Sequence, residues 1–366
     1  PLYSSAASDV YKRQTLDDLS LPLKFETRKN VKLSDIFVYP DLEKMSTREK
    51  RIDEVYNSKK IIKENIKLIG LEGDVQSGKT SLLNIFYLDF LKLGKYPILI
   101  EAKKLMSNNI EKVVKRCFEE QYKSNGSDFE CFRQHNIEDK ILLIDNLQDF
   151  TYNGATLVQV IKELNLSFGQ IIFSTTTFFS FSSALNAEFE NLAYYFIQPL
   201  GYKKRNELIE KYHILNESPL TVTDQLILEK TKFHFDQIQT VLGNQLIPAH
   251  PVYILSILQT LIYANSPNLE QTSLGYCYQS LLYVALVDKA KIRNDEVDAY
   301  FNFLSELAFS LYQTNDDSFT DEYFNEFYRL YSDRFIAKGL TRDKLLASNI
   351  IITSNENEYR LSLIHI

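Results

Sequence analysis

The sequence predicts an α/β fold in which a parallel β-sheet is covered by helices on both faces. Between residues 65 and 200, short apolar runs alternate with amphipathic helical patterns, and this alternation is typical of such a sheet. A glycine-rich turn, Gly73-x-x-x-x-Gly78-Lys79-Thr80, directly follows the first apolar run. After Gly201 the strand-like runs stop, whereas apolar residues at helical spacing continue. The chain is therefore expected to hold an α/β domain followed by helical domains.

The α/β domain is expected over residues 65–200. Its strands are the apolar runs Lys67–Leu71, Tyr96–Glu101, Lys140–Asp145, Gln170–Thr175 and Ala193–Gln198. Helical patterns lie between them, near Lys79–Leu93, Asn109–Lys123, Ala155–Leu164 and Ser183–Glu190. Residues 15–64 are expected to form a linker with short extended pieces, followed by a charged helix over Ser46–Glu64 with Ser46 or Thr47 as its N-cap.

The rest of the chain is expected to form two helical domains. Residues 201–295 carry four segments with apolar residues at helical spacing, which predict a helical lid domain. Residues 296–360 show three further helical segments, near 296–313, 320–333 and 342–347. Two short apolar runs around the sequence SNENE follow them and predict a β-hairpin. Helices that end in a hairpin suggest a winged-helix domain.

The two ends of the chain are related to each other at the level of DNA. One codon choice for Asp9–Gln14 has a reverse complement that encodes Leu361–Ile366, and both ends resemble a transposase-type sequencing adapter. Residues 1–14 and 361–366 are therefore expected to be non-native tails, and such segments mislead fold reasoning. The native part is expected to span about residues 15–360, with its former flanking regions lost.

Composition argues against several classes of protein. The net charge of -7 over 366 residues, or -8 without residues 1–14, argues weakly against broad nucleic-acid or membrane binding, and it remains compatible with a local basic patch. The sequence has no apolar run long enough to span a membrane and no recognisable secretory signal. Its three cysteines lack histidine partners at metal-binding spacing, so they are expected to be buried thiols in a reducing compartment. The sequence thus predicts a cytoplasmic protein without a membrane partner.

The turn after the first strand has the spacing of a phosphate loop. Glycines allow backbone N–H groups to crowd around phosphate oxygens, and the following helix points its N-terminus at the anion. Lys79 is expected to reach the β- and γ-phosphates of a nucleotide, and the Thr80 hydroxyl to bind Mg²⁺. The nucleotide-binding residues expected here are Gly73, Asp74, Val75, Gln76, Ser77, Gly78, Lys79, Thr80 and Ser81.

A carboxylate at the end of another strand completes the expected site. Asp145 ends the run KILLID and is expected to meet the magnesium shell together with Thr80. Catalysis needs a further carboxylate to position the attacking water; Asp149 is placed for this role, although it is equally explained as a solvated loop acid. The expected catalytic residues are thus Lys79, Asp145 and Asp149. The hydroxyls of Ser174–Thr177 either sense the γ-phosphate or cap a strand end.

The sequences GDVQSGKTSLL and ILLIDNLQD, the helical domain and the terminal winged-helix pattern together resemble the STAND class of signal-transduction ATPases with numerous domains. Within that class the chain resembles the bacterial NACHT-like and AP-ATPase-like members, which are often found in anti-phage defence. The resemblance covers most of residues 67–360. It implies a P-loop NTPase core of AAA+/STAND type, ATP or ADP with Mg²⁺ as cofactors, and self-association on activation. It also implies an effector domain before this fragment and a sensor region after it.

Two departures from the family pattern bear on hydrolysis. Members usually carry Asp, a small residue and then two acids after the strand; here Gln148 replaces one acid, whereas Asp149 matches the catalytic position. Thr175–Thr177 stand where the family has an arginine, so hydrolysis is expected to be slow. The segment LIPAHPVYILSIL is similar to the family's proline-bearing helix start, which implies that Pro251, with His250 before it, lies near the base or ribose. A proline in the first turn of a helix is also ordinary.

Two hypotheses for function differ in what the nucleotide does. In the first, ADP keeps the lid and winged helix folded on the core, and ATP favours an open form that self-associates and activates an effector. In the second, an AAA+-like ATPase associated with DNA binds duplex DNA through the winged helix. A DNA backbone would be repelled by the acidic tip SNENE, so the switch is favoured. Arg205 is more simply a surface charge than a phosphate ligand, and Lys203 and Lys204 are expected to be solvated.

Overall fold

A computed structural model of the chain divides into two compact units. The first is formed mainly by Phe25–Thr231 together with His250–Val252, and the second mainly by Lys232–Ala249 and Tyr253–Ile366. The described residues are 16–19, 23, 25–28, 30–45, 52–64, 66–74, 76–105, 109–122, 126–176, 182–189, 191–218, 222–242, 248–263, 282, 286, 290, 292–293, 296–314, 316, 318–335, 340–348, 350–355 and 358–361.

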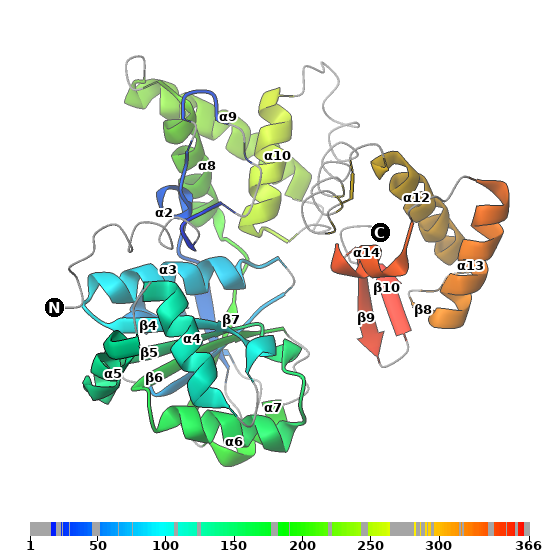
Figure 1. The fold of residues 1–366 in the computed structure, drawn as a ribbon. Coiled ribbons are helices and arrows are strands. Elements are labelled where there is room, and N and C mark those ends of the chain that lie inside the picture. The colour runs from blue at the N-terminus through cyan, green and yellow to red at the C-terminus, as the bar shows by residue number, and fades with distance from the viewer. Residues whose placement is uncertain are drawn as a thin grey trace. The chain divides into compact units, whose positions relative to one another are not determined.

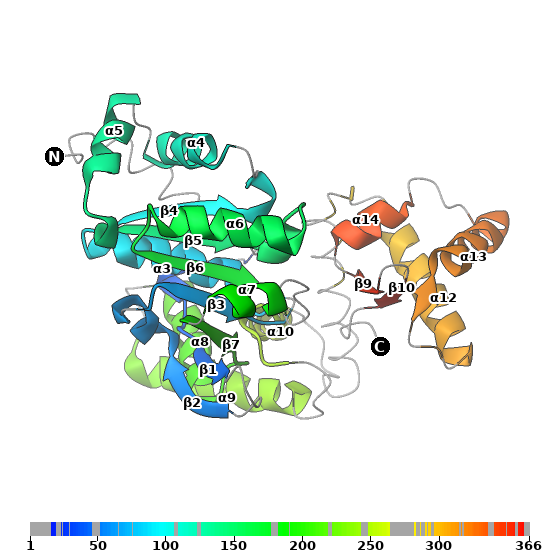
Figure 2. The same cartoon turned by 90° about the horizontal axis from the view of Figure 1, so that it is seen from below.

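Within the described residues, the first unit contains a seven-stranded sheet in the order β2-β1-β7-β3-β6-β5-β4 (Figure 2). Its strands are β1 Asp41–Met45, β2 Ile52–Asn57, β3 Leu68–Glu72, β4 Tyr96–Glu101, β5 Lys140–Asp145, β6 Gln170–Thr175 and β7 Leu192–Ile197. The strands from β7 to β4 are parallel, whereas β1 pairs antiparallel with both β7 and β2. The carboxyl ends of β3, β6 and β5 therefore lie side by side at one edge of the sheet.

Helices cover both faces of this sheet, as its buried parallel strands require (Figure 1). One face is covered by α3 Lys79–Lys92, and the other by α4 Ile110–Tyr122, α5 Gly126–Gln134, α6 Gly154–Asn165 and α7 Ser182–Glu188. Shorter helical turns are α2 Leu33–Ile36 and the 3-10 helices η1 Ser58–Lys63, η2 Ala102–Lys104, η3 Ile137–Asp139 and η4 Leu147–Asp149.

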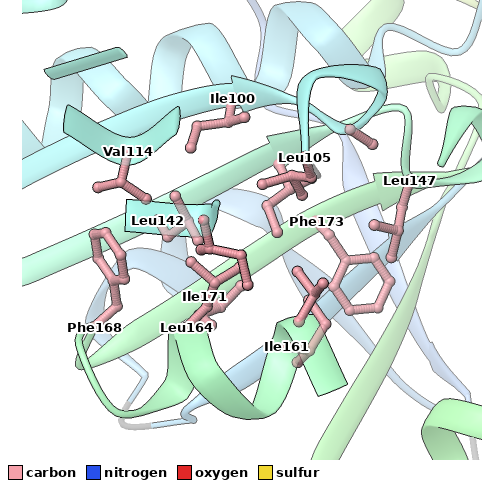
Figure 3. Packing of buried hydrophobic residues seen from close by; sticks show 14 of the residues in the cluster. Ile100, Leu105, Val114, Leu142, Leu147, Ile161, Leu164, Phe168, Ile171 and Phe173 are labelled. Atoms are coloured by element: carbon pink, nitrogen blue, oxygen red, sulfur yellow. The ribbon is translucent and has the colours of Figure 1, made fainter. Parts of the chain in front are cut away.

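The strand β5 shows how one short segment fills two cores. Leu142 and Ile144 belong to the cluster packed against α4 and α6, whereas Ile141 and Leu143 belong to the cluster packed against α3. All four side chains are buried. This alternation follows from the two-residue repeat of a strand. Figure 3 shows the first cluster, in which Leu142 lies among side chains of the neighbouring strands and of α6.

The expected helix over Ser46–Glu64 is wrong. Within the described part of that range, Ile52–Asn57 forms the strand β2 and Ser58–Lys63 forms the short helix η1. Residues 46–51, with both suggested N-caps, lie outside the described residues. The strand β2 pairs with β1, which lies in the range expected to be a linker and whose Leu42 is fully buried. Pairing to the sheet therefore overrides the local helical pattern.

The other strands and helices predicted for the first unit are confirmed, with ends that differ by a few residues. The sequence pattern does not predict α5, a short helix held by Phe129 and Phe132, each 3% exposed. On the same helix Cys131 is exposed, so the expectation of buried thiols is wrong for this residue, although Cys117 is buried. Cys277 lies outside the described residues.

The region expected to be a helical domain contains α8 Tyr202–Asn216, α9 Asp224–Leu242 and α10 Pro251–Tyr263. The fourth expected helix, over 271–291, lies almost entirely outside the described residues. Where the described residues form helices, none combines the length and apolar character needed to cross a bilayer.

The helix α8 belongs to the first unit and is held against its N-terminal segment. The Lys211 ammonium donates to the backbone carbonyl oxygen of Phe37 (2.6 Å). The Lys204 ammonium lies 2.8 Å from the Asp41 carboxylate, at the start of β1. The expectation that Lys204 is solvated is therefore wrong, because its side chain is largely buried in this contact.

The second unit contains, among its described residues, α12 Val297–Thr314, β8 Phe319–Thr320, α13 Asp321–Arg334, α14 Arg342–Ala347, β9 Ile351–Asn355 and β10 Glu358–Leu361. The strands form an antiparallel sheet in the order β8-β10-β9. Phe303 of α12 is fully buried, and its ring centroid lies 5.7 Å from that of Phe324 and 5.1 Å from that of Tyr331 on α13. The expected helices and hairpin are present, and the winged-helix assignment stays a prediction.

Candidate functional site

The phosphate-loop residues connect β3 to α3 and adopt a tightly curled backbone. Gly78 is the N-cap of α3 and has a φ of 90°, a conformation that is strained for a residue with a side chain. Gly73 permits a close approach, because a Cβ atom at this position would lie 2.6 Å from Ser77 Oγ. Gln76 also has a positive φ, of 66°. Val75 lies outside the described residues.

Lys79 is buried inside this loop. Its Nζ atom donates hydrogen bonds to the backbone carbonyl oxygens of Gly73 (2.8 Å) and Asp74 (2.6 Å). The ammonium group thus lies at the centre of the curled segment, where a phosphate group held by the loop would meet it. Thr80 and Ser81 follow in the first turn of α3, so the sequence places every described residue of the motif correctly at this strand-to-helix turn.

A hydrogen-bond network joins Thr80 to the ends of β5 and β6. Thr80 Oγ1 donates to Asp145 Oδ2 (2.8 Å), and Ser174 Oγ donates to Asp145 Oδ1 (2.6 Å). The same serine oxygen accepts a hydrogen bond from the backbone N–H of Asn146 (2.9 Å). Asp145 is buried, and a buried carboxylate needs such partners. Ser174 therefore positions Asp145, a role that sequence reasoning missed.

The residues after Asp145 turn away from the strand. Asn146 lies in the left-handed region, with a φ of 55°, and precedes the helical turn η4. Gln148 Nε2 donates to Asn146 Oδ1 (3.3 Å). Amide side chains cannot accept a proton at neutral pH. Within Asn146–Asp149 the only carboxylate that can serve as a base is therefore Asp149.

Asp149 lies among the charges at the carboxyl ends of β4 and β5. Partial burial raises the pKa of its carboxyl, the Lys103 ammonium lowers it, and the Asp145 and Glu101 carboxylates raise it. Lys103 in turn pairs with Glu101 (2.7 Å). A carboxyl with a raised pKa in such a group suits proton transfer. Because the side chain is also exposed, its assignment as a catalytic acid rather than a solvated one stays a prediction.

His250 lies beside the phosphate loop. Its Nε2 atom is 3.8 Å from Asp74 Oδ2, and its ring is 1% exposed. His250 holds the pKa of the Asp74 carboxyl below its usual value, partial burial opposes this, and the Lys79 ammonium assists. Pro251, the next residue, begins α10. The structure thus brings the start of α10 to the loop, and the contact of Pro251 with a base or ribose stays a prediction.

Two further charged side chains have partners that the sequence alone does not indicate. Arg205 Nε donates to the carbonyl oxygen of Leu200 (2.7 Å), and its guanidinium lies 4.6 Å from the Tyr202 ring centroid, so Arg205 is engaged locally at the start of α8. Glu101 was not singled out, yet it is the register partner of Asp145 across β4 and β5. A polar residue at the carboxyl end of a predicted parallel strand is the signal that points to it.

The loop and strand ends fit a nucleotide phosphate with Mg²⁺. Thr80 and Asp145 offer the hydroxyl and carboxylate oxygens that Mg²⁺ prefers. The buried Ser77 Oγ and Thr175 Oγ1 atoms have no hydrogen-bond partner within the described residues, and the Thr175 carbonyl accepts a bond from the Gly73 N–H (3.3 Å). Buried hydroxyls of this kind require a polar partner, and a phosphate group meets that requirement.

No protein-family model and no curated protein sequence matches the chain. Among solved structures it is similar to domain III of the replication initiation protein DnaA from Thermotoga maritima, with 16% identity and a TM-score of 0.36 over 59% of this chain and 87% of that one. It is also similar to the Thermotoga maritima RuvB Holliday junction branch migration motor, with 12% identity and a TM-score of 0.32. That similarity covers 84% of this chain and 91% of the RuvB chain. The structure of Drosophila ORC bound to DNA is similar at 12% identity, with a TM-score of 0.39. That similarity covers 82% of this chain and 88% of the ORC chain. A likeness at this level transfers no function.

Proposed function

We propose that the chain is an ATP- and ADP-binding switch that hydrolyses ATP slowly with Mg²⁺. The observation that carries the proposal is the 2.8 Å hydrogen bond between Thr80 and Asp145, next to the loop-held Lys79. This arrangement gathers a cation, a hydroxyl and a carboxylate at the N-terminus of α3. A Mg²⁺-bound triphosphate is the ligand that such a combination recognises best.

Each residue has a defined role in this mechanism. Lys79 exchanges the loop carbonyl oxygens for oxygens of the β- and γ-phosphates, while the loop N–H groups hold the remaining phosphate charge. Thr80 and Asp145 would hold Mg²⁺, which would neutralise the charge that develops on the phosphates. Ser174 keeps the Asp145 carboxylate in its orientation through the 2.6 Å hydrogen bond. Asp149 positions the attacking water and accepts its proton.

Slow hydrolysis is supported by the residues that follow Asp145. Asn146 and Gln148 hold amides, which bond to each other and accept no proton. The one remaining carboxylate among them, Asp149, lies four residues beyond the strand, and its side chain is exposed. A well-formed phosphate loop with few catalytic groups around it favours binding a nucleotide over turning it over rapidly.

The switch itself is supported by the contact between the loop and the start of α10. His250 lies 3.8 Å from Asp74, so a change in the loop on nucleotide exchange acts directly on the residue before α10. In the proposed cycle, ADP stabilises a closed form and ATP an open form that self-associates and activates an effector, as in cytoplasmic anti-phage signalling of the STAND type. A ligand produces such a shift only through different affinities for the two forms.

The alternative, an ATPase that binds duplex DNA through the second unit, is disfavoured by charge. Residues 296–360 carry twelve Asp and Glu against six Lys and Arg, a formal charge of -6. Arg342 on α14 pairs with Asp321, and Lys344 lies 3.7 Å from Glu296. Cations engaged by carboxylates are poorly available to phosphates, and affinity for duplex DNA depends on free ones.

The experiment that tests the proposal is calorimetric titration of the chain with ADP and ATP in the presence of Mg²⁺. Lys79→Ala removes the cation of the loop and should abolish binding of both nucleotides. Lys92→Ala, at the far end of the same helix and 71% exposed, is the matched control and should bind normally. Wild-type affinity in Lys79→Ala, with an unchanged circular dichroism spectrum, would overturn the proposal.

A further inference from the structure

A cavity lies away from the phosphate loop, between η2 and one face of α4. Its volume is about 390 Å³, within the range of small-ligand sites. The short helix η2 contributes Lys103 and Lys104 to its lining. Asn109, directly before α4, continues the helical face on which α4 contributes five residues: Lys112, Val113, Arg116, Cys117 and Glu120.

The lining of this cavity is positively charged, although the chain as a whole carries a net charge of -7. Among the described residues, four cations line it against one carboxylate, that of Glu120, which lies 3.0 Å from Arg116. A single carboxylate just outside the lining, Glu101, pairs with both Lys103 (2.7 Å) and Lys104 (2.9 Å). Local positive charge on an acidic protein concentrates anions at that point.

Lys112 differs from the other cations of the cavity. It is exposed and, within the described part of the chain, forms no ion pair. Asn109 precedes the first residue of α4, so the cavity also reaches the N-terminus of a 13-residue helix. Helix N-termini present N–H groups and a partial positive charge to anions. The cavity therefore combines the ammonium of Lys112, which has no ion-pair partner among the described residues, with the guanidinium of Arg116 and the N-terminus of α4.

We propose that this cavity binds a phosphate-bearing ligand at a site separate from the phosphate loop. Phosphate fits this lining better than carboxylate does, because it carries more charge and offers three or four acceptor oxygens to converging lysines and an arginine. Free phosphorylated small molecules and the backbone of a nucleic acid both present this chemistry. The mixed apolar and cationic lining, with Val113 and Cys117 among the cations, accommodates the organic part of either ligand.

Binding of a ligand in the cavity should also change the electrostatic environment of the hydrolytic site. Lys103 lines the cavity and pairs with Glu101, and both charges act on Asp149. A phosphate that engages Lys103 competes with Glu101 for the same ammonium, which changes the charge around Asp149. This coupling rests on the proposed ATP hydrolysis, whereas binding in the cavity does not depend on it.

Direct binding measurements on the full chain test the site. Two probes are used: inorganic tripolyphosphate by calorimetry, and a fluorescein-labelled single-stranded oligonucleotide by anisotropy. Saturating ADP with Mg²⁺ occupies the phosphate loop, and the same titrations on Lys79→Ala separate cavity binding from loop binding. Lys112→Glu should weaken binding at least tenfold, or by about 1.4 kcal/mol, because it replaces a charged hydrogen-bond donor with a carboxylate that repels phosphate.

The matched control is Lys115→Glu, which makes the same charge change on the same helix. Lys115 lies outside the cavity lining and 3.9 Å from Glu119. It should leave affinity within about threefold of wild type, because its ammonium lies outside the lining and makes no direct contact with a ligand held there. Tripolyphosphate binding identifies a free phosphorylated ligand, and binding of the oligonucleotide alone identifies a nucleic-acid backbone.

Two outcomes overturn the proposal: neither probe binds the ADP-loaded chain, or Lys112→Glu and Lys115→Glu lose affinity equally. Each variant is first checked by circular dichroism against wild type. Because ADP affinity is measured separately, failure of the cavity site leaves the proposed switch intact. Failure of nucleotide binding likewise leaves the Lys79→Ala titrations of the cavity interpretable.

Discussion

Thr80 Oγ1 lies 2.8 Å from Asp145 Oδ2, although their residues belong to elements that are not neighbours in the sheet. Thr80 lies in the first turn of the helix that follows β3, Asp145 ends β5, and β6 lies between those two strands. The hydroxyl and the carboxylate therefore meet above the carboxyl end of β6, which supplies Ser174 to the same carboxylate. This meeting point is where a Mg²⁺ ion would have to sit to contact both oxygens.

Thr80→Ala should remove the part of nucleotide affinity that depends on Mg²⁺ while leaving Mg²⁺-free binding. The methyl group keeps the helix but offers no oxygen to the metal, whereas Thr80→Ser should restore the wild-type response because it retains the hydroxyl. Calorimetric titrations with ATP, with Mg²⁺ and with a chelator, measure the difference. Thr156→Ala, which removes a hydroxyl from the first turn of α6, is the control. A full Mg²⁺ response in Thr80→Ala would remove this residue from the metal site.

The strands that carry the site could be predicted because burial alone determines their pattern. The runs that form β3, β5 and β6 are buried on both faces, so they are nearly continuous in apolar residues. The strand β2 escaped prediction because it is the edge of the sheet, where one neighbour and partial exposure leave a mixed, charged sequence. Such a pattern is compatible with a helix until the partner strand is known.

The residues of the candidate site also differ in how far the sequence alone identifies them. Lys79, Thr80 and Asp145 are identifiable because each has a fixed place in a local strand-and-turn pattern. Ser174 and Glu101 acquire their roles from the order of strands in the sheet, which places their ends next to Asp145. Strand order is a tertiary property, and a single sequence without partners does not encode it in any local spacing.

Lys103→Gln should move the acidic limb of the ATP hydrolysis profile to higher pH. Removing this ammonium removes a charge that lowers the pKa of Asp149, so the pKa rises further and less carboxylate is present at a given pH. Glu101→Gln should act in the opposite direction, because it removes a charge that raises the pKa. The measurement is the initial rate against pH at low and high salt. Salt should reduce both shifts, since the Lys103 ammonium is exposed.

Asp149→Asn provides the reference for that experiment. It should lower the rate at every pH and leave nucleotide affinity unchanged, because an amide positions water poorly and accepts no proton. If Lys103→Gln shifts the profile equally in the Asp149→Asn background, the titrating group is another residue. Unchanged turnover in Asp149→Asn would remove Asp149 from the mechanism.

Gly70→Ala should destabilise the first unit by about 1–3 kcal/mol, the usual cost of inserting a methyl group into a filled core. A Cβ atom at Gly70 would lie 2.6 Å from Tyr194 Cδ1 and 2.8 Å from Phe173 Cζ, on the two strands that flank β3. Gly201→Ala is the control, because a Cβ there meets no atom within 4 Å; Gly201 is the N-cap of α8, where Ala is less favourable than Gly, so it should cost no more than about 1 kcal/mol. Urea unfolding followed by circular dichroism measures both, and equal stabilities would show that the sheet relaxes around the methyl group.

The contact between His250 and Asp74 leads to the last prediction, which separates a switch from a DNA-stimulated ATPase. His250 is buried 3.8 Å from the Asp74 carboxylate, and Pro251 begins α10 immediately after it. In the switch, the start of α10 belongs to the closed, ADP-bound form and is released in the ATP-bound form. Pro251→Ala and His250→Ala should therefore weaken ADP binding more than ATP binding, and should increase self-association of the chain.

A small difference in affinity is enough for this behaviour. A two-state ratio changes tenfold for about 1.4 kcal/mol, so the loss of one contact that exists in the closed form alone shifts the population measurably. Paired ADP and ATP titrations of Pro251→Ala, each repeated with duplex DNA and combined with light scattering, give the three readouts together. An ATPase driven by DNA would lose affinity for both nucleotides equally and would hydrolyse ATP faster when DNA is added. Equal losses with DNA stimulation would make the switch wrong, because the start of α10 would then contribute the same free energy to both nucleotide states.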